Sequence, residues 1–104
     1  MSMGLEISLQ DGQGHELVSV TDRNGYLMEL LPVDDDDNHP LLASIDRNGE
    51  TIFNRIQMKR FLSEWADVAR SAQAMQQHAL ISAVESLARR CQDGPHLFLK
   101  FAGD

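Results

Sequence analysis

The densest group of side chains able to do chemistry is a run of four aspartates followed closely by a histidine: Asp34, Asp35, Asp36, Asp37 and His39. Carboxylate oxygens are the ligands that Ca²⁺ and Mg²⁺ prefer, so this acidic loop could serve a small metal-dependent hydrolase. Adjacent aspartates cannot all converge on one ion, however, and the spacing of a calcium-binding loop fails with Gly25 or Gly49 at its sixth position. We therefore expect a solvated loop, kept exposed by charge repulsion, that binds no metal.

The histidines give no stronger indication of a metal site. The chain has four: His15, His39, His78 and His96. Their spacings match neither an HxxxH pair nor an HExxH motif, either of which would place two ligands on one helical face. We expect scattered surface histidines and no metal ion or other cofactor.

Nucleophilic catalysis is not indicated either. No serine lies in a GxSxG motif, and Cys91, the only cysteine, follows Val84 by seven residues along an apolar helical stripe. This position predicts a buried, unreactive thiol. A single cysteine cannot form an intrachain disulfide, which is consistent with a reducing compartment. These observations together predict a protein that is not an enzyme.

Length and composition predict one globular domain over residues 1 to 104. Apolar residues make up 42% of the chain and charged residues 24%, which is a typical globular mixture. No stretch of about 18 apolar residues is present, and the first residues lack the basic and apolar regions of a signal peptide. We expect a cytoplasmic protein without membrane contact.

The charge is distributed unevenly along the chain. The formal net charge is −7, with −9 in residues 1 to 50 and +2 in residues 51 to 104. Phosphate groups are bound by clustered Lys and Arg, so an acidic chain disfavours nucleic acid and anionic membranes as partners. A basic protein is the electrostatically favoured partner.

The element that must position the rest is a long amphipathic stretch beginning at Phe53. Asn54 suits a helix N-cap and Gln57 lies three residues on, which is the capping-box spacing. The spacing therefore predicts a helix from Arg55, and capping explains the polar cluster that these residues form with Thr51. The first part of the stretch has a broad apolar stripe that includes Trp65, with charged residues on its other faces: Lys59, Arg60, Glu64, Asp67 and Arg70.

The end of the stretch is marked by Gly94 at a C′-like position and by Pro95, which predict a stop near Gln92. One helix over residues 55 to 92 would be about 57 Å long at about 1.5 Å per residue, which is long for a domain of this size. We predict a break between Ser71 and Met75, giving helices over 55 to 71 and 74 to 92. A single long helix paired with a second subunit is the alternative.

Alternating apolar residues predict strands over residues 4 to 10, 15 to 20 and 96 to 102. Leu27, Leu30 and Leu31 have helical spacing before Pro32, which predicts a short helix over residues 26 to 31. Two Asp-Arg-Asn-Gly tetrapeptides, at residues 22 to 25 and 46 to 49, are interpreted as similar turns rather than as a repeat. The predicted fold is α+β, with an antiparallel sheet of about three strands packed against the helices on one face.

Phe98 is the residue of the last strand that alternates away from the core. An outward phenylalanine predicts that a helix or a second subunit covers this face. Together with the long apolar stripe, it predicts a symmetric homodimer.

Two segments resemble a group of small bacterial proteins of unknown activity. They are Asp46 to Asn54, followed by Gln57, and the terminal Leu97 to Asp104. In that group an aspartate-to-glycine turn leads into a Thr-x-Phe-Asn segment, two helices follow, and an aromatic-x-Gly-Asp sequence ends the chain. The resemblance covers about residues 26 to 104 and implies a bacterial cytoplasmic protein, but it assigns no functional residue.

The leading functional hypothesis is a non-enzymatic bacterial protein-binding module with an acidic binding face, in the manner of a toxin-neutralising immunity protein. Its candidate partner-binding residues are Asp34, Asp35, Asp36, Asp37 and Phe98. The alternatives are the hydrolase that uses the acidic loop with His39, and a purely structural subunit of a homo-oligomer.

Overall fold

The structure is a computed structural model that describes residues 4 to 32, 37 to 71 and 76 to 103. Four strands form one antiparallel sheet in the order β2-β1-β4-β3. The strands are β1 (Glu6–Gln10), β2 (Glu16–Thr21), β3 (Glu50–Asn54) and β4 (Phe98–Ala102). The two strands farthest apart in sequence, β1 and β4, are therefore central neighbours, and β2 and β3 are the edges.

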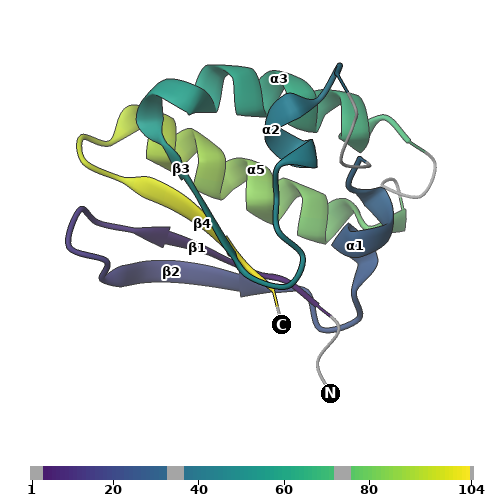
Figure 1. Cartoon of the computed structure of the whole chain (residues 1–104), viewed down its shortest axis with the longest axis horizontal. Coiled ribbons are helices and arrows are strands. Elements are labelled where there is room, and N and C mark those ends of the chain that lie inside the picture. The colour runs from purple at the N-terminus through teal and green to yellow at the C-terminus, as the bar shows by residue number, and fades with distance from the viewer. Residues whose placement is uncertain (1–3, 33–36, 72–75, 104) are drawn as a thin grey trace.

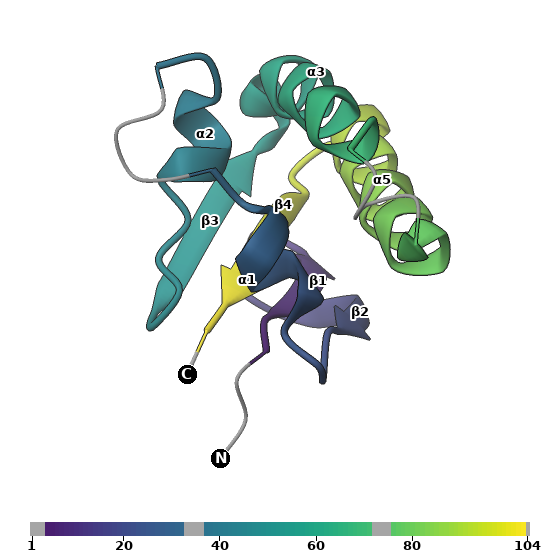
Figure 2. The ribbon, with the colours of Figure 1, turned by 90° about the vertical axis from the view of Figure 1, so that its right-hand side faces the viewer.

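Helices cover one face of the sheet, as Figures 1 and 2 show. The short helices are α1 (Tyr26–Leu30), α2 (Pro40–Ala43) and the 3₁₀ turn η1 (Arg55–Gln57). The long ones are α3 (Met58–Ala69) and α5 (His78–Asp93), which pack side by side. The predicted α+β fold is thus confirmed, with the helices on one face.

The core lies between the sheet and the helices. Ile7, Leu9, Leu99 and Phe101 alternate towards it from the two central strands, and all are fully buried. The ring of Phe61 on α3 lies 5.8 Å from both the Phe101 ring and the Trp65 ring, measured between centroids. The apolar stripes of α3 and α5 are buried within this single chain: Met58, Phe61, Trp65, Val68, Ile81, Val84, Leu87, Ala88 and Cys91. The stripe therefore does not require a second subunit, which removes one of the two grounds for the predicted homodimer.

The stretch from residue 55 to 92 forms two helices rather than one. α3 ends at Ala69 and α5 begins at His78, so the chain reverses between them. The predicted break at Ser71 to Met75 lies between them, although residues 72 to 75 are outside the described part of the chain.

The predicted capping box is present at the start of this stretch. The Asn54 side chain accepts a hydrogen bond from the Gln57 amide at 3.1 Å, and the Gln57 side chain accepts one from the Asn54 amide at 2.8 Å. These bonds satisfy amide groups that have no partner within the helix. The helix begins at Arg55 as predicted, but its first three residues form a 3₁₀ turn.

The end of α5 differs from the prediction in one detail. Gly94 follows the helix in an extended conformation, with φ −98°, and is not in the left-handed region that a C′ glycine would occupy. The chain folds back tightly here: a Cβ atom at Gly94 would lie 2.2 Å from Cδ1 of Leu97. This close approach leaves no room for a side chain at position 94. The left-handed residue is His96 instead, with φ 60°.

The two Asp-Arg-Asn-Gly segments form the same kind of turn, as predicted. The amide of Gly25 donates to the carbonyl of Asp22, and the amide of Gly49 donates to the carbonyl of Asp46. The prediction of about three strands missed β3, which follows the second turn and pairs with β4. No helix in the described part of the chain is long and apolar enough to span a membrane.

Candidate functional site

The acidic loop does not form a site among the described residues. Asp34, Asp35 and Asp36 lie outside them, and Asp37 is exposed. The predicted partner-binding role of these four aspartates therefore stays a prediction. Within residues 4–32, 37–71 and 76–103, no group of three His, Cys, Asp or Glu side chains could hold a metal ion.

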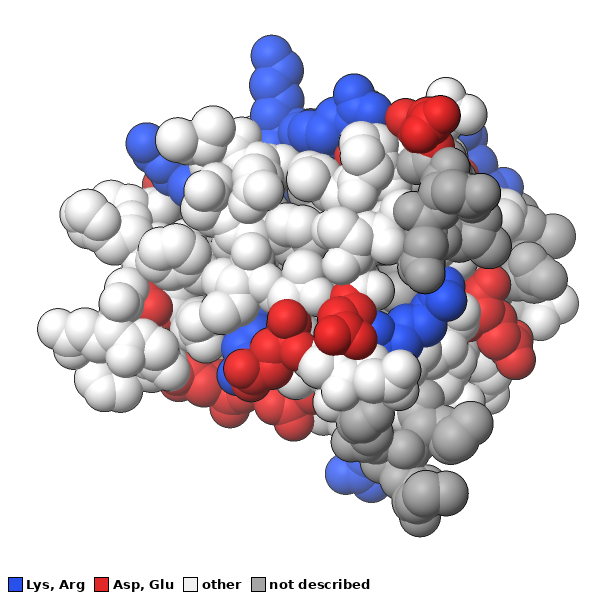
Figure 3. Space-filling model, in the orientation of Figure 1, with Lys and Arg blue, Asp and Glu red and all other residues white. Residues whose placement is uncertain are grey.

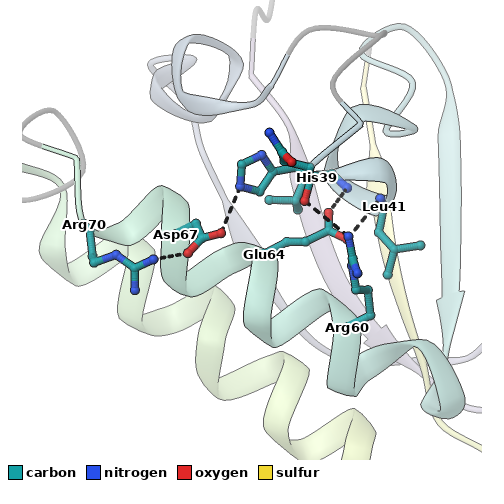
Figure 4. Close-up of polar contacts among 8 residues, drawn as sticks. His39, Leu41, Arg60, Glu64, Asp67 and Arg70 are labelled. Carbon is teal, nitrogen blue, oxygen red and sulfur yellow. Dashed lines mark hydrogen bonds and ion pairs between the residues drawn. The ribbon is translucent and has the colours of Figure 1, made fainter.

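His39 takes part in a polar network between α2 and α3, which Figure 4 shows. Its Nε2 lies 3.1 Å from Oδ2 of Asp67, and the other oxygen of Asp67 pairs with Arg70. Glu64, one turn earlier on α3, is only 2% exposed. Its two carboxylate oxygens accept hydrogen bonds from the amides of Leu41 (3.3 Å) and Leu42 (3.0 Å) at the start of α2, and one also accepts from Nε of Arg60 at 2.9 Å.

Glu64 lies off the apolar stripe, as predicted, but unlike its charged neighbours it is buried. The carboxylate is buried because it caps a helix that lies more than twenty residues earlier in the chain, a contact that no local pattern predicts. Both of its oxygens are occupied by structural donors, so the group joins α2 to α3 rather than binding a substrate.

The remaining histidines and the cysteine do not form a catalytic arrangement. His15 lies 3.2 Å from Asp11 within the loop between β1 and β2, whereas His78 and His96 are exposed. Cys91 is buried, its Sγ lies 3.5 Å from the carbonyl of Leu97, and burial raises the pKa of its thiol from 9.0 to about 11. The predicted buried thiol is confirmed, and its protonated state at neutral pH makes it a poor nucleophile.

The best candidate for a functional surface is the side of the sheet away from the helices. We call it the open face and define it by the outward residues of the three strands β1, β4 and β3: Glu6, Ser8, Gln10, Phe98, Lys100, Ala102, Glu50, Ile52 and Asn54. These residues alternate with the buried core residues, and those directly opposite one another share a face. Figure 2 shows the helical layer on the other side of the strands.

The open face is acidic around one lysine. Nζ of Lys100 lies 2.6 Å from Oε2 of Glu50, and this hydrogen bond raises the pKa of Lys100 above its ordinary value. The negative charges of Glu50, Glu6 and Glu16 act in the same direction. Glu6 shares the face with Lys100, two residues along β1 from Ser8, which lies opposite the lysine. Glu16, the first residue of β2, pairs with Gln10 at the end of β1, where the strand register shifts.

Apolar side chains accompany these charges. Ile52 is 50% exposed although it lies directly opposite Lys100 on the neighbouring strand. Phe98 points to the open face, as predicted, and is half-buried. A Cβ atom on Gly12 would lie 4.0 Å from Cε2 of Phe98, so the loop between β1 and β2 shields one edge of the ring. Neither a helix nor a strand of the described residues covers this face, so of the two predicted covers, a helix or a second subunit, only the second subunit stays a prediction.

Sequence reasoning identified Phe98 but missed the glutamates that share its face of the sheet. The signal was present in the alternation of β1 and β4, which places Glu6 and Lys100 on the face opposite the core. Glu50 and Ile52 could join them only once β3 was recognised as a strand.

No protein-family model matches this chain, and neither a curated protein nor a solved structure matches it. The open face therefore has to be interpreted from its own geometry and charge.

Proposed function

We propose that the protein is a non-enzymatic binding module of the bacterial cytoplasm whose open face binds a basic protein. The observation that carries this proposal is that the strand register places Glu6 and Glu50 on the open face with a single lysine, Lys100, together with the exposed Ile52 and the half-buried Phe98. A toxin-neutralising immunity protein is the kind of module that this surface fits, because such a protein needs a stable scaffold and a complementary charge rather than catalytic groups.

Charge and apolar area have separate roles in this proposal. Glu6, Glu16 and Glu50 attract and orient a basic surface, and they reject acidic ones. The aliphatic and aromatic side chains of Ile52 and Phe98 supply the contact area that excludes water. Lys100 on β4 forms its ion pair with Glu50 on the neighbouring strand β3. Glu6 and Glu16 are therefore left available to a partner.

The proposal is tested with two matched variants. The acid-face variant, Glu6→Gln with Glu16→Gln, removes the two exposed acidic charges that are left available when Glu50 pairs with Lys100. The control variant, Glu29→Gln with Asp93→Asn, removes two charges from exposed positions on α1 and α5. Immobilised wild type and both variants are used to capture proteins from an extract of the source cell, and each captured protein is then purified and its affinity measured by calorimetry.

We expect a captured basic protein that binds the wild type and the control variant equally. It should bind the acid-face variant about tenfold more weakly, and the loss should shrink as salt is added. Phe98→Ala should also weaken binding without changing the salt dependence. Equal binding to all three proteins would show that another surface is used and would contradict the proposal.

No specific observation favours either alternative function, the hydrolase or the structural homo-oligomer subunit. A hydrolase that uses the acidic loop would need His39 to act on a substrate, but its imidazole bonds to Asp67 in the network that joins α2 to α3. A purely structural homo-oligomer subunit stays a prediction.

A further inference from the structure

A second surface of the molecule has the opposite charge to the open face. Arg55 and Ile56 on η1 and Lys59 and Arg60 on α3 form what we call the basic end. Ile56 is 84% exposed, more than any other large apolar side chain that the structure describes as exposed. Residues three and four apart are neighbours on a helix surface, so Lys59 and Arg60 flank Ile56.

The cations of the basic end are available to a partner. Arg55 and Lys59 are exposed and form no ion pair within the described part of the chain. Arg60 donates through Nε to Glu64 and through Nη2 to the carbonyl of Asn38, and its side chain is still 56% exposed. The proposed partner of the open face is basic and offers apolar contact area. The basic end, with an exposed isoleucine among cations, has both properties.

The two surfaces lie on different layers of the molecule. The basic end begins α3 in the helical layer, whereas the open face is the far side of the sheet. Figure 3 shows Lys and Arg side chains along the upper edge, over α3, with a smaller acidic group towards its right, and a larger group of Asp and Glu side chains along the lower edge, beneath the strands. A molecule that is polarised in this way can present both halves of one interface.

We propose that a second copy of the chain docks its basic end on the open face, with Ile56 against Ile52 and Phe98 and with Arg55 and Lys59 towards the glutamates. The inference rests on the proposed function, because the second copy occupies the same open face. Since the two surfaces differ, the contact is head-to-tail: each copy of a pair uses one surface, and the pair keeps one unused surface of each kind. Association should therefore continue beyond two copies instead of closing as the symmetric dimer that the sequence predicted.

The test uses sedimentation and light scattering at about 50 mM salt, where exposed charges act over more than about 10 Å. The basic-end variant, Ile56→Gln with Lys59→Gln, removes one surface and the acid-face variant removes the other. A control variant, Tyr26→Gln with Arg90→Gln, changes an exposed aromatic and an exposed basic residue on α1 and α5. Circular dichroism checks that each variant is folded.

The expected result is a wild-type mass that rises with protein concentration past twice the monomer mass of 11.7 kDa and falls back to it in high salt. The control variant should behave like the wild type, while the basic-end and acid-face variants should each stay monomeric. Mixed together, these two variants should form a one-to-one pair and no larger species, because only one complementary contact remains between them.

Two results would overturn the inference. One is a wild type that stays monomeric under these conditions, and the other is a mass that stops at two copies and is unchanged in the basic-end variant. A synthetic peptide of alternating lysine and leucine separates the two proposals. If the peptide binds the wild type but not the acid-face variant while self-association is absent, only the head-to-tail contact is wrong; if it binds neither, the proposed function fails as well.

Discussion

At the scale of single residues, Asn54 offers the most direct test of how the helical layer begins. Its side chain and that of Gln57 exchange hydrogen bonds across the first turn after β3. Asn54→Ala removes the N-cap and should lower the free energy of unfolding by about 1 kcal/mol, which urea denaturation would measure. Ser63→Ala, at an exposed position in the middle of α3, is the control and should change stability little.

Cys91 provides a second residue-scale prediction, because the fold keeps its thiol protonated. Its pKa is raised from 9.0 to about 11, so the native state holds a proton that the unfolded state loses between these values. The corresponding stabilisation is complete below pH 9 and disappears as the pH rises to 11. Stability measured across this range should fall less steeply in Cys91→Ala than in the wild type.

The reactivity of Cys91 checks the same point independently. At pH 8 a thiol reagent should modify the native protein only as fast as it opens, and should modify the urea-unfolded protein at once. Rapid labelling of the native protein would mean that the thiol is accessible and would contradict its burial.

These residues also show what a sequence can predict at this scale. The bond partners of Asn54 lie three residues away, so the motif is complete within one turn of chain. Glu64 has the same chemistry, a side-chain oxygen that accepts from helix amides, but its acceptor role depends on Leu41 and Leu42. Helical periodicity places Glu64 among charged neighbours, and only the packing of α2 against α3 explains its burial.

At the scale of elements, the Glu64 carboxylate is the main polar link between α2 and α3. Glu64→Ala would leave the amides of Leu41 and Leu42 without their acceptor, and the Leu42 amide is buried, so we expect a loss of about 2 kcal/mol. Glu64→Gln keeps one acceptor oxygen and should lose less. Asp67→Asn, which alters only the more exposed pairs with His39 and Arg70, is the comparison for denaturant melts. A loss after Asp67→Asn as large as that after Glu64→Ala would contradict this ranking.

The predicted elements were correct where a pattern extended over several residues of one chain segment. The strands over 4 to 10, 15 to 20 and 96 to 102 correspond to β1, β2 and β4 because each alternates between the core and the other face. β3 was missed because Ile52 and Phe53 are adjacent apolar residues, and only Phe53 points to the core. Its strand character comes from pairing with β4, which is separated from it by both long helices.

At the scale of the whole molecule, the sheet has one covered side and one open side, and β4 allows a direct comparison of the two. Phe101 is fully buried, whereas Phe98 on the same strand points to the open face and is half-buried. Phe101→Ala should cost about 3 to 5 kcal/mol, enough to unfold much of the protein. Phe98→Ala should cost far less, and its thermal unfolding should remain cooperative.

The opposite ranking would mean that something covers the open face in solution. If Phe98→Ala unfolds the protein at low concentration but not at high concentration, a second copy supplies the cover. Sedimentation of wild type and variant at matched concentrations would detect this.

Function was the least predictable property, for a physical reason. The excess of acidic residues in residues 1 to 50 indicated a basic partner, but the run of aspartates placed four of the five candidate binding residues in the acidic loop. The surface that gathers charge and apolar area is assembled from Glu6, Glu50, Ile52, Phe98 and Lys100, which come from three separate segments. Only the strand order brings them together.

That strand order also constrains how the chain is made. The centre of the sheet joins Glu6 with Ala102 and Leu9 with Leu99, so β1 must wait for β4 to be synthesised before the two can pair. Until then β1 and β2 can form only an isolated hairpin, which is marginally stable in water, and the helical stripes have no complete sheet to pack on. Until β4 is made, the apolar residues of nearly all these elements are therefore exposed, and folding should be a single event that follows the synthesis of β4 rather than a stepwise one.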